Sequence, residues 1–331
     1  MDLTTPYLGR TLPNPFLPGA SPLSDEIDTI RRLEDAGAGA IVLRSLFEEQ
    51  ITREGLATIA HLERHGESFA EATSFFPNPD SFILGPEEYL GHLRKVKESV
   101  GIPVFASLNG TTAGGWLEYA RLMEQAGADA LELNVYHVAT NPGLSGTALE
   151  QEILAMVRQV KQDLSIAVAV KLSPFFTSFA HFAKSLDEAG ADGLVLFNRF
   201  YEPDLDVQEL EVTRALHLSD SSELLLRLRW MAILSGRVKA SLAVTGGVHT
   251  ALDAVKSIMA GAHVVQMVSA LILNGPSHLR KVLDDLAAWM EENEWSSLAE
   301  MRGNMSLLRV PDPKVYERGN YMLMLQGREL F

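Results

Sequence analysis

Short apolar, β-branched runs alternate along this chain with longer segments that have a helical pattern of apolar residues. Four times a helix-like segment ends in Ala-Gly-Ala and passes directly into such a run, at 36–38, 126–128, 189–191 and 260–262. A glycine just past a helix adopts the left-handed conformation that closes the last turn. Helices recurring between apolar strands are typical of βα units that build a parallel sheet.

The same pattern predicts eight strands, at 16–21, 40–45, 103–108, 130–135, 166–172, 193–197, 241–244 and 264–267. Helices are predicted at about 86–100, 114–125, 148–164, 179–188 and 277–293, with a polar excursion at 199–222 before the sixth helix. Eight strand–helix alternations are what a closed (β/α)8 TIM barrel needs. We expect a barrel over 1–294, opened by a hairpin that plugs its floor. An extension over 295–331 is expected to pack on the barrel or on a sister subunit.

Composition narrows the class of function. The 331 residues carry a net charge of −15 and include no cysteine. The acidic balance and the lack of a basic run interleaved with aromatics argue against a nucleic-acid partner. Without cysteine there can be no disulfide, Cys-ligated zinc, iron–sulfur cluster or thiol nucleophile, and we predict no metal site. No stretch is apolar enough to span a membrane, and the start does not resemble a signal peptide. We therefore expect a cytoplasmic protein.

Such barrels carry their chemistry at the C-terminal ends of the strands. The seventh strand ends in Thr245-Gly246-Gly247 and the eighth near Val268-Ser269. Phosphates commonly bind between these two loops, although a glycine pair also occurs in any tight turn. His249 beside this turn is expected to cap a helix or to meet the phosphate.

The fifth strand ends with Lys171, where a buried strand would normally deliver an apolar residue. Either its ammonium faces a bound cofactor or anion, or it pairs with Glu132, which we expect to point away from the mouth as a structural partner. Asn134 and Asn198 end the fourth and sixth strands and could bind a planar heterocycle. Each could equally make only a cap or loop hydrogen bond.

In order along the chain, these strand ends resemble those of the dihydroorotate dehydrogenase family of FMN-binding barrels over about residues 1–290. The motifs are Leu131-Glu132-Leu133-Asn134, Lys171-Leu172-Ser173-Pro174, Phe197-Asn198, Thr245-Gly246-Gly247-Val248 and Gly261-Ala262-x-Val264-Val265-Gln266. The resemblance implies that FMN is held by Ala20, Ser21, Arg44, Ser45, Asn134, Lys171, Asn198, Gly246, Gly247, Val268 and Ser269. It also implies that Lys171 takes part in catalysis and that Asn134 and Asn198 reach the substrate.

The chain departs from the family at three substrate contacts. His137 stands at the position of the family's cysteine base and could replace it, because imidazole titrates near neutral pH; it could also be an ordinary loop residue. The stretch 72–78 lacks the family's first, substrate-binding asparagine, and its Phe75 and Phe76 suit either the core or a ligand wall. Arg199 replaces a small hydroxyl residue, and either binds an anionic group of the substrate or pairs with Glu202 or Asp204.

We therefore expect an FMN-dependent oxidoreductase that acts on a CH–CH bond of a small dihydropyrimidine-like substrate, as a homodimer. The electron acceptor is left open. One alternative is a flavin-binding barrel without catalysis. The other is a phosphate-binding lyase or aldolase in which Lys171 forms a Schiff base.

Overall fold

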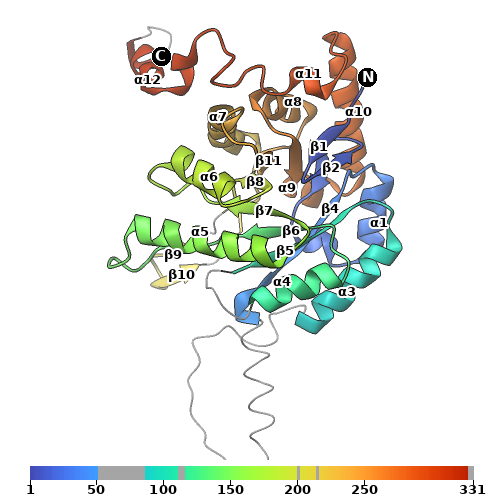
Figure 1. The fold of residues 1–331 in the computed structure, drawn as a ribbon. Coiled ribbons are helices and arrows are strands. Elements are labelled where there is room, and N and C mark those ends of the chain that lie inside the picture. The colour runs from blue at the N-terminus through green and yellow to red at the C-terminus, as the bar shows by residue number, and fades with distance from the viewer. Residues whose placement is uncertain (51–85, 111–115, 200–201, 214–215, 327–331) are drawn as a thin grey trace, which may run out of the picture.

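The computed structural model describes residues 1–50, 86–110, 116–199, 202–213 and 216–326 (Figure 1). Eight parallel strands follow the order β3-β12-β11-β8-β7-β6-β5-β4 in one sheet. Their bounds are Phe16–Pro18 (β3), Ile41–Phe47 (β4), Val104–Asn109 (β5), Ala130–Asn134 (β6), Ala167–Leu172 (β7), Gly193–Leu196 (β8), Ser241–Thr245 (β11) and Val264–Met267 (β12). The two end strands meet where the Gly39 N–H donates to the Phe16 carbonyl at 2.8 Å. The predicted (β/α)8 barrel is confirmed.

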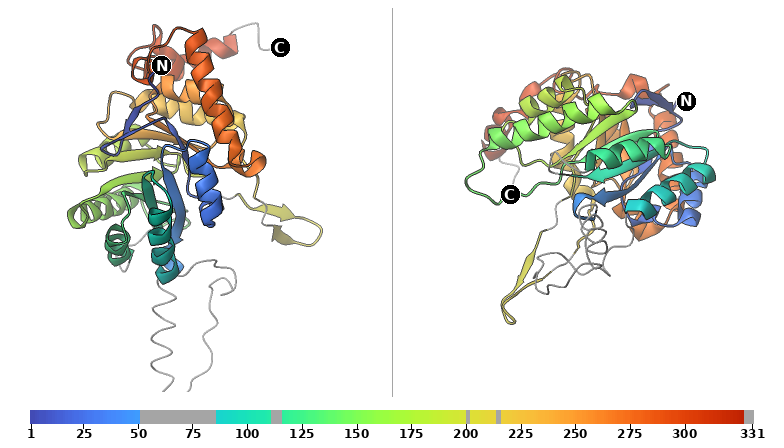
Figure 2. Two further views of the ribbon diagram at one scale, coloured as in Figure 1. Left: turned by 90° about the vertical axis from the view of Figure 1, so that its right-hand side faces the viewer. Right: turned by 60° about the horizontal axis from the view of Figure 1, so that its bottom comes forward.

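Helices cover the outside of this barrel (Figures 1 and 2). They span Ile27–Asp35 (α1), Pro86–Ser99 (α3), Trp116–Gln125 (α4), Gly146–Asp163 (α5), Phe179–Glu188 (α6), Leu224–Leu234 (α7), Ala251–Ala260 (α8) and Ser277–Glu292 (α10). The glycines of the four Ala-Gly-Ala motifs all have positive φ, from 96° at Gly37 to 130° at Gly261. The alanine after each glycine bonds back to the helix, as Ala38 N–H does to the Leu33 carbonyl at 3.0 Å. The predicted helix ends are thus Schellman turns.

An antiparallel hairpin closes the barrel floor, as predicted. It consists of β1 (Thr5–Tyr7) and β2 (Arg10–Leu12). Its buried residues Tyr7, Leu8 and Leu12 form one apolar cluster with inward-facing strand residues such as Phe105. The floor is therefore filled with apolar side chains, which leaves the polar groups of the strands at the other end.

The polar excursion contains a second hairpin that the sequence analysis did not predict, β9 (Asp204–Asp206) and β10 (Glu211–Thr213). It projects from the barrel (Figure 2). Most of its residues are exposed, including Val207 at 77% and Leu210 at 88%. The available signal was the run of apolar residues Leu205, Val207, Leu210 and Val212 among polar ones, which is typical of short strands.

The C-terminal segment lies at the end of the barrel opposite this hairpin (Figure 1). It contains α11 (Leu298–Met301) and α12 (Arg318–Gln326), while the short α9 (Ser269–Asn274) follows β12. Single 3-10 turns lie at Pro22–Ser24, Ser221–Glu223 and Pro313–Tyr316. Backbone bonds such as Gly303 N–H to the Ile258 carbonyl at 3.0 Å attach the segment to α8. None of the helices in the described ranges is long and apolar enough to cross a membrane.

Candidate functional site

A buried charged network lies inside the barrel, above the apolar floor. Lys171 Nζ lies 3.2 Å from Glu132 Oε1, and both residues are almost fully buried. Gln266 Nε2 donates to the second carboxylate oxygen of Glu132 at 2.5 Å, while Gln266 Oε1 is buried without a hydrogen-bond partner. The pairing of Lys171 with Glu132 is confirmed. The expectation that Glu132 points away from the mouth is wrong. Its side chain faces the barrel interior, as does that of Asn134 two residues further along β6. Asn134 is in register with Lys171.

The carboxylate of Glu132 influences two buried tyrosines. Burial raises the pKa of Tyr7 and of Tyr89, and the negative charge of Glu132 raises both further. The Tyr89 hydroxyl donates to the Ser107 carbonyl at 3.2 Å, and Ser107 Oγ bonds to Ser45 Oγ at 2.7 Å. Both tyrosines therefore stay neutral phenols. The hydroxyl groups of Tyr89, Ser107 and Ser45 are all hydrogen-bonded.

Three asparagines lie at the mouth, at the ends of β5 and β6 and just after β8. Asn198 Nδ2 donates to Asn134 Oδ1 at 2.8 Å, so the two asparagines predicted at the mouth meet. Asn109 is buried at the end of β5 and is in register with Asn134. The sequence analysis missed Asn109, although its position at the end of a predicted inner strand was the available signal. Amide groups here provide both donors and acceptors for a planar ligand.

The other predicted contacts of the ring, Ala20, Ser21, Arg44 and Ser45, lie after β3 and within β4. Ser21 follows β3, and its hydroxyl donates to the Gly19 carbonyl at 3.0 Å. Arg44 forms an ion pair with Asp25 at 2.7 Å. Burial raises the pKa of Asp25, whereas the charge of Arg44 opposes that shift. Ala20 and Ser21 follow β3, whereas Arg44 and Ser45 lie inside β4, which continues to Phe47 beyond the predicted end at residue 45.

Three loops converge at the predicted phosphate anchor. Gly246 and Gly247 after β11 have φ of 82° and 78°. Ser219, from the excursion after β8, bonds through its hydroxyl to Ser269 Oγ at 2.9 Å and accepts from Gly247 N–H at 3.3 Å. Val268 and Ser269 follow β12 and begin α9. The fold thus brings the glycines and serines together from separate parts of the chain. The sequence predicted this meeting only for the loops after β11 and β12, and not for Ser219.

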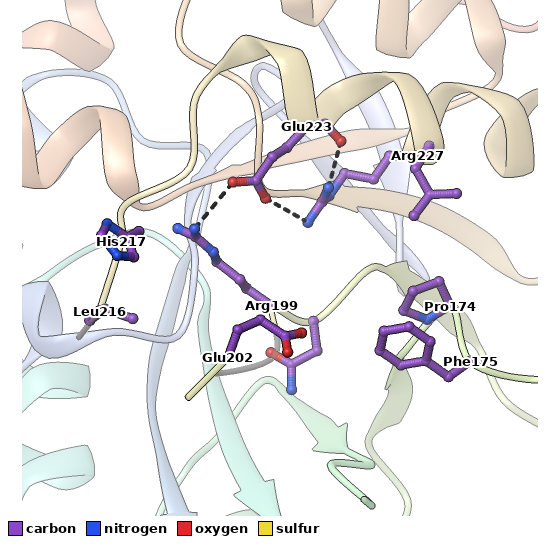
Figure 3. A pocket seen from close by; sticks show the side chains of 10 residues that line it. Pro174, Phe175, Arg199, Glu202, Leu216, His217, Glu223 and Arg227 are labelled. Atoms are coloured by element: carbon purple, nitrogen blue, oxygen red, sulfur yellow. Dashed lines mark hydrogen bonds and ion pairs between the residues drawn. The ribbon is translucent and has the colours of Figure 1, made fainter. Parts of the chain in front are cut away.

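A cavity of about 310 Å3 adjoins the amide cluster (Figure 3). Within it the Glu223 carboxylate forms ion pairs with two arginines, with Arg199 at 3.2 Å and with Arg227 at 3.9 Å. The alternative that Arg199 pairs with Glu202 or Asp204 is wrong, because the turn before α7 brings Glu223 over the mouth instead. Arg227 was not predicted; it is 5% exposed, and its guanidinium also donates to the Thr245 carbonyl next to Gly246. Burial lowers the pKa of Arg227, and Glu223 partly restores it.

The two candidate histidines differ in their surroundings. His137 is half-buried in the loop after β6, and within the described residues no hydrogen bond or ion pair of its side chain is found. His249 does not cap α8, because Thr250 and Asp253 form a capping box there. Its Nε2 is buried and has no hydrogen-bond partner among the residues that the structure describes. The stretch 72–78, with Phe75 and Phe76, lies outside the described residues.

Comparison with known proteins agrees with this architecture. The chain is 28% identical to the catalytic subunit of dihydroorotate dehydrogenase B (NAD(+)) of Thermoplasma acidophilum, over 91% of this chain and 98% of the relative. It is 28% identical to a putative dihydroorotate dehydrogenase A (fumarate) of Aeropyrum pernix, over 91% and 97% of the two chains. The family model for dihydroorotate dehydrogenase matches residues 2–290. The chain therefore belongs to the dihydroorotate dehydrogenase family.

Proposed function

We propose that this protein is an FMN-dependent oxidoreductase that oxidises a CH–CH bond of a small dihydropyrimidine-like substrate. The observation that carries the proposal is the buried Lys171, in register with Asn134 at the barrel mouth. The ion pair with Glu132 accounts for the burial of the ammonium, and the position of Lys171 near a strand end at this face of the barrel is where such barrels carry catalytic groups. The family of this chain supports the same reaction class.

The residues at the mouth fit a flavin mononucleotide. Its phosphate would bind at Gly246, Gly247, Val268 and Ser269, where Arg227 adds a nearby positive charge. Ala20, Ser21, Arg44, Ser45, Asn134, Lys171 and Asn198 would surround the ring, and the unpartnered Gln266 Oε1 is an unused acceptor in the same network. When bound, FMN would accept a hydride from the substrate. Lys171 would stabilise the negative charge that develops on reduction.

Asn134, Asn198 and Arg199 would bind the substrate, and His137 would remove its proton. The proton leaves the carbon next to the one that loses the hydride, so the base must lie within hydrogen-bond reach of that carbon. His137 is the base in this proposal because imidazole needs no activation near pH 7. Arg199 would exchange its ion pair with Glu223 for an anionic group on the substrate.

The visible spectrum of the purified protein tests the cofactor, and mass spectrometry of the released ligand identifies it. Adding dihydroorotate under nitrogen should bleach the flavin absorbance. A yellow protein that no dihydropyrimidine bleaches would support a barrel without catalysis. A colourless protein that borohydride traps with a carbonyl substrate on Lys171 would support the lyase instead.

We also propose that the protein is a homodimer that buries the β9–β10 hairpin. Four exposed apolar residues support this, Leu205, Val207, Leu210 and Val212, because a projecting apolar surface favours association. Sedimentation equilibrium should give twice the chain mass, and Val207→Asp should give the monomer. Leu252→Asp, an equivalent change at an exposed position on α8, should leave the dimer intact. A wild-type monomer would refute the proposal.

A further inference from the structure

A second cavity lies at the N-terminal end of the barrel, opposite the site described above. Its volume is about 480 Å3. One wall comes from the turn between α7 and β11 and from His263 just before β12, and the other from residues 299–309 of the C-terminal segment. The strands therefore begin at this cavity and end at the candidate active site.

The cavity is positively charged and has no acidic lining. Lys239, Arg302 and Arg309 line it, and none of its lining residues is acidic. Within the described ranges no ion pair joins these three cations to a carboxylate. Arg302 instead donates to Thr5 Oγ1 at 2.7 Å and to the Ala262 carbonyl at 3.3 Å. Asp187 does not line the cavity, and it is engaged by the backbone N–H groups of Lys239 and Ala240.

The positive charge of Arg302 affects the pKa of the neighbouring His263. Burial lowers the pKa of His263 to about 4, and the positive charge of Arg302 contributes to the shift. Burial also lowers the pKa of Arg302 itself. A partly buried guanidinium that is matched only by neutral acceptors is energetically unfavourable, and a bound anion would relieve this.

Small residues lie where the C-terminal segment meets the barrel at the cavity. A Cβ at Gly261 would lie 2.4 Å from Ser235 Oγ, and a Cβ at Gly303 would lie 2.7 Å from the same atom. Ser235 and Ser306 add hydroxyl groups to the lining. The glycines let the C-terminal segment approach the barrel closely.

Two of the three cations that line the cavity follow the last residue that the family model matches. The family model ends at residue 290, whereas Arg302 and Arg309 follow it. Their segment is held in place by backbone bonds, such as Met305 N–H to the Met259 carbonyl at 2.9 Å. The cavity thus lies between the barrel and the C-terminal segment, and the inference drawn from it does not depend on the proposed oxidoreductase activity.

We propose that this cavity binds a small metabolite that carries a phosphate group. Three cations, two hydroxyls and no carboxylate suit a dianion, for which arginine provides paired donors. The cavity volume lies within the range of small-molecule sites and exceeds what one inorganic phosphate needs. The same β11 and α8 that border the cavity carry Gly246 and Gly247 between them, so a ligand here contacts the elements that hold the proposed cofactor anchor.

Isothermal titration calorimetry of the purified protein with inorganic phosphate and with pyrophosphate, at constant ionic strength, tests this proposal. Pyrophosphate should bind with one site per chain that is weakened at least tenfold in the double variant Lys239→Gln/Arg309→Gln. Both side chains are exposed to solvent, so their replacement should not prevent folding. The glycine anchor at the other end keeps its residues in this variant, so any binding there would be a second site that the variant leaves unchanged.

Arg237→Gln is the matched control, because it removes one positive charge next to the lining residues Gly236 and Val238 without lining the cavity itself. It should bind pyrophosphate as the wild type does. Equal affinity in the wild type and the double variant would overturn the proposal. An equal loss in Arg237→Gln would overturn it too, since the effect would then be one of general charge.

Discussion

Lys171 Nζ lies 3.2 Å from Glu132 Oε1 inside the barrel, and each side chain is at most 6% exposed. Two opposite charges this deeply buried stabilise each other, but either one alone would be strongly unfavourable. Glu132 is also bonded to Gln266, so its position is fixed from two sides. The pair therefore holds the ammonium of Lys171 at the level where a bound cofactor would meet it.

Lys171→Met should destabilise the protein by about 3 kcal/mol or more, because it leaves the Glu132 carboxylate buried and unpaired. The double variant Lys171→Met/Glu132→Gln should recover most of that loss. Urea unfolding of the three proteins measures both effects. If Lys171 also serves the flavin, both variants should retain FMN poorly or reduce it slowly, whatever their stability. Normal retention and reduction in the double variant would remove Lys171 from the cofactor site.

His137→Asn should slow turnover about 10²–10⁴-fold and leave the flavin bound, since only proton removal is lost. His181→Asn, at an exposed position on α6, is the control and should turn over normally. Stopped-flow reduction under nitrogen measures the affected step directly. Normal reduction in His137→Asn would mean that another group is the base.

Gly247→Ala should destabilise the protein by about 2 kcal/mol or more. Its φ of 78° is unfavourable for alanine, and the added Cβ would lie 2.6 Å from the Leu224 backbone nitrogen. Flavin retention should fall as well, because the anchor would shift. Gly91→Ala on α3 is the control; nothing lies within 4 Å of its added Cβ, and it should stabilise the helix by about 0.5–1 kcal/mol. Thermal unfolding and the flavin-to-protein absorbance ratio measure these changes.

The barrel could be predicted because its strands are buried on both faces and therefore appear as nearly uninterrupted apolar runs. Gly37 and Gly190 marked helix ends, because the turn that closes each helix needs a residue with positive φ. Lys171, Asn134 and Asn198 stood out for the opposite reason, as polar residues at the ends of apolar strands. These signals are local in the sequence, and local signals suffice for element order and for the ends of inner strands.

The rest of the site depends on contacts between distant segments. Ser219 precedes the turn before α7, and Arg227 lies within α7. No residue near them in the sequence indicates that they meet Ser269 and Thr245. The alternative that paired Arg199 with Glu202 or Asp204 was wrong for the same reason, since its partner Glu223 lies further along the chain. The pairing was decided by the path of the chain into α7, which brings Glu223 over the mouth.

Arg199→Gln should raise the KM of an anionic substrate about tenfold without loss of flavin. The reason is that a charged hydrogen bond is removed at the substrate and not at the cofactor anchor. Arg229→Gln, at an exposed position of α7, removes the same charge away from the cavity and should leave KM unchanged. Steady-state kinetics with dihydroorotate provides the comparison. An unchanged KM in Arg199→Gln would show that the Glu223 pair is its only role.

His263 predicts how stability depends on pH. Its pKa in the folded protein is about 4, below its ordinary value of 6.5, so the unfolded chain binds the proton more readily. Stability is therefore unaffected by this group above pH 6.5 and is lost as the pH falls from 6.5 to 4, by on the order of 3 kcal/mol in full. In His263→Gln this part of the loss should disappear, while Gln can still accept the Leu242 N–H that His263 Nδ1 accepts at 3.0 Å. Urea unfolding of both proteins at pH 7 and pH 4.5, in a buffer without phosphate, measures the difference; parallel losses in the two proteins would contradict the prediction.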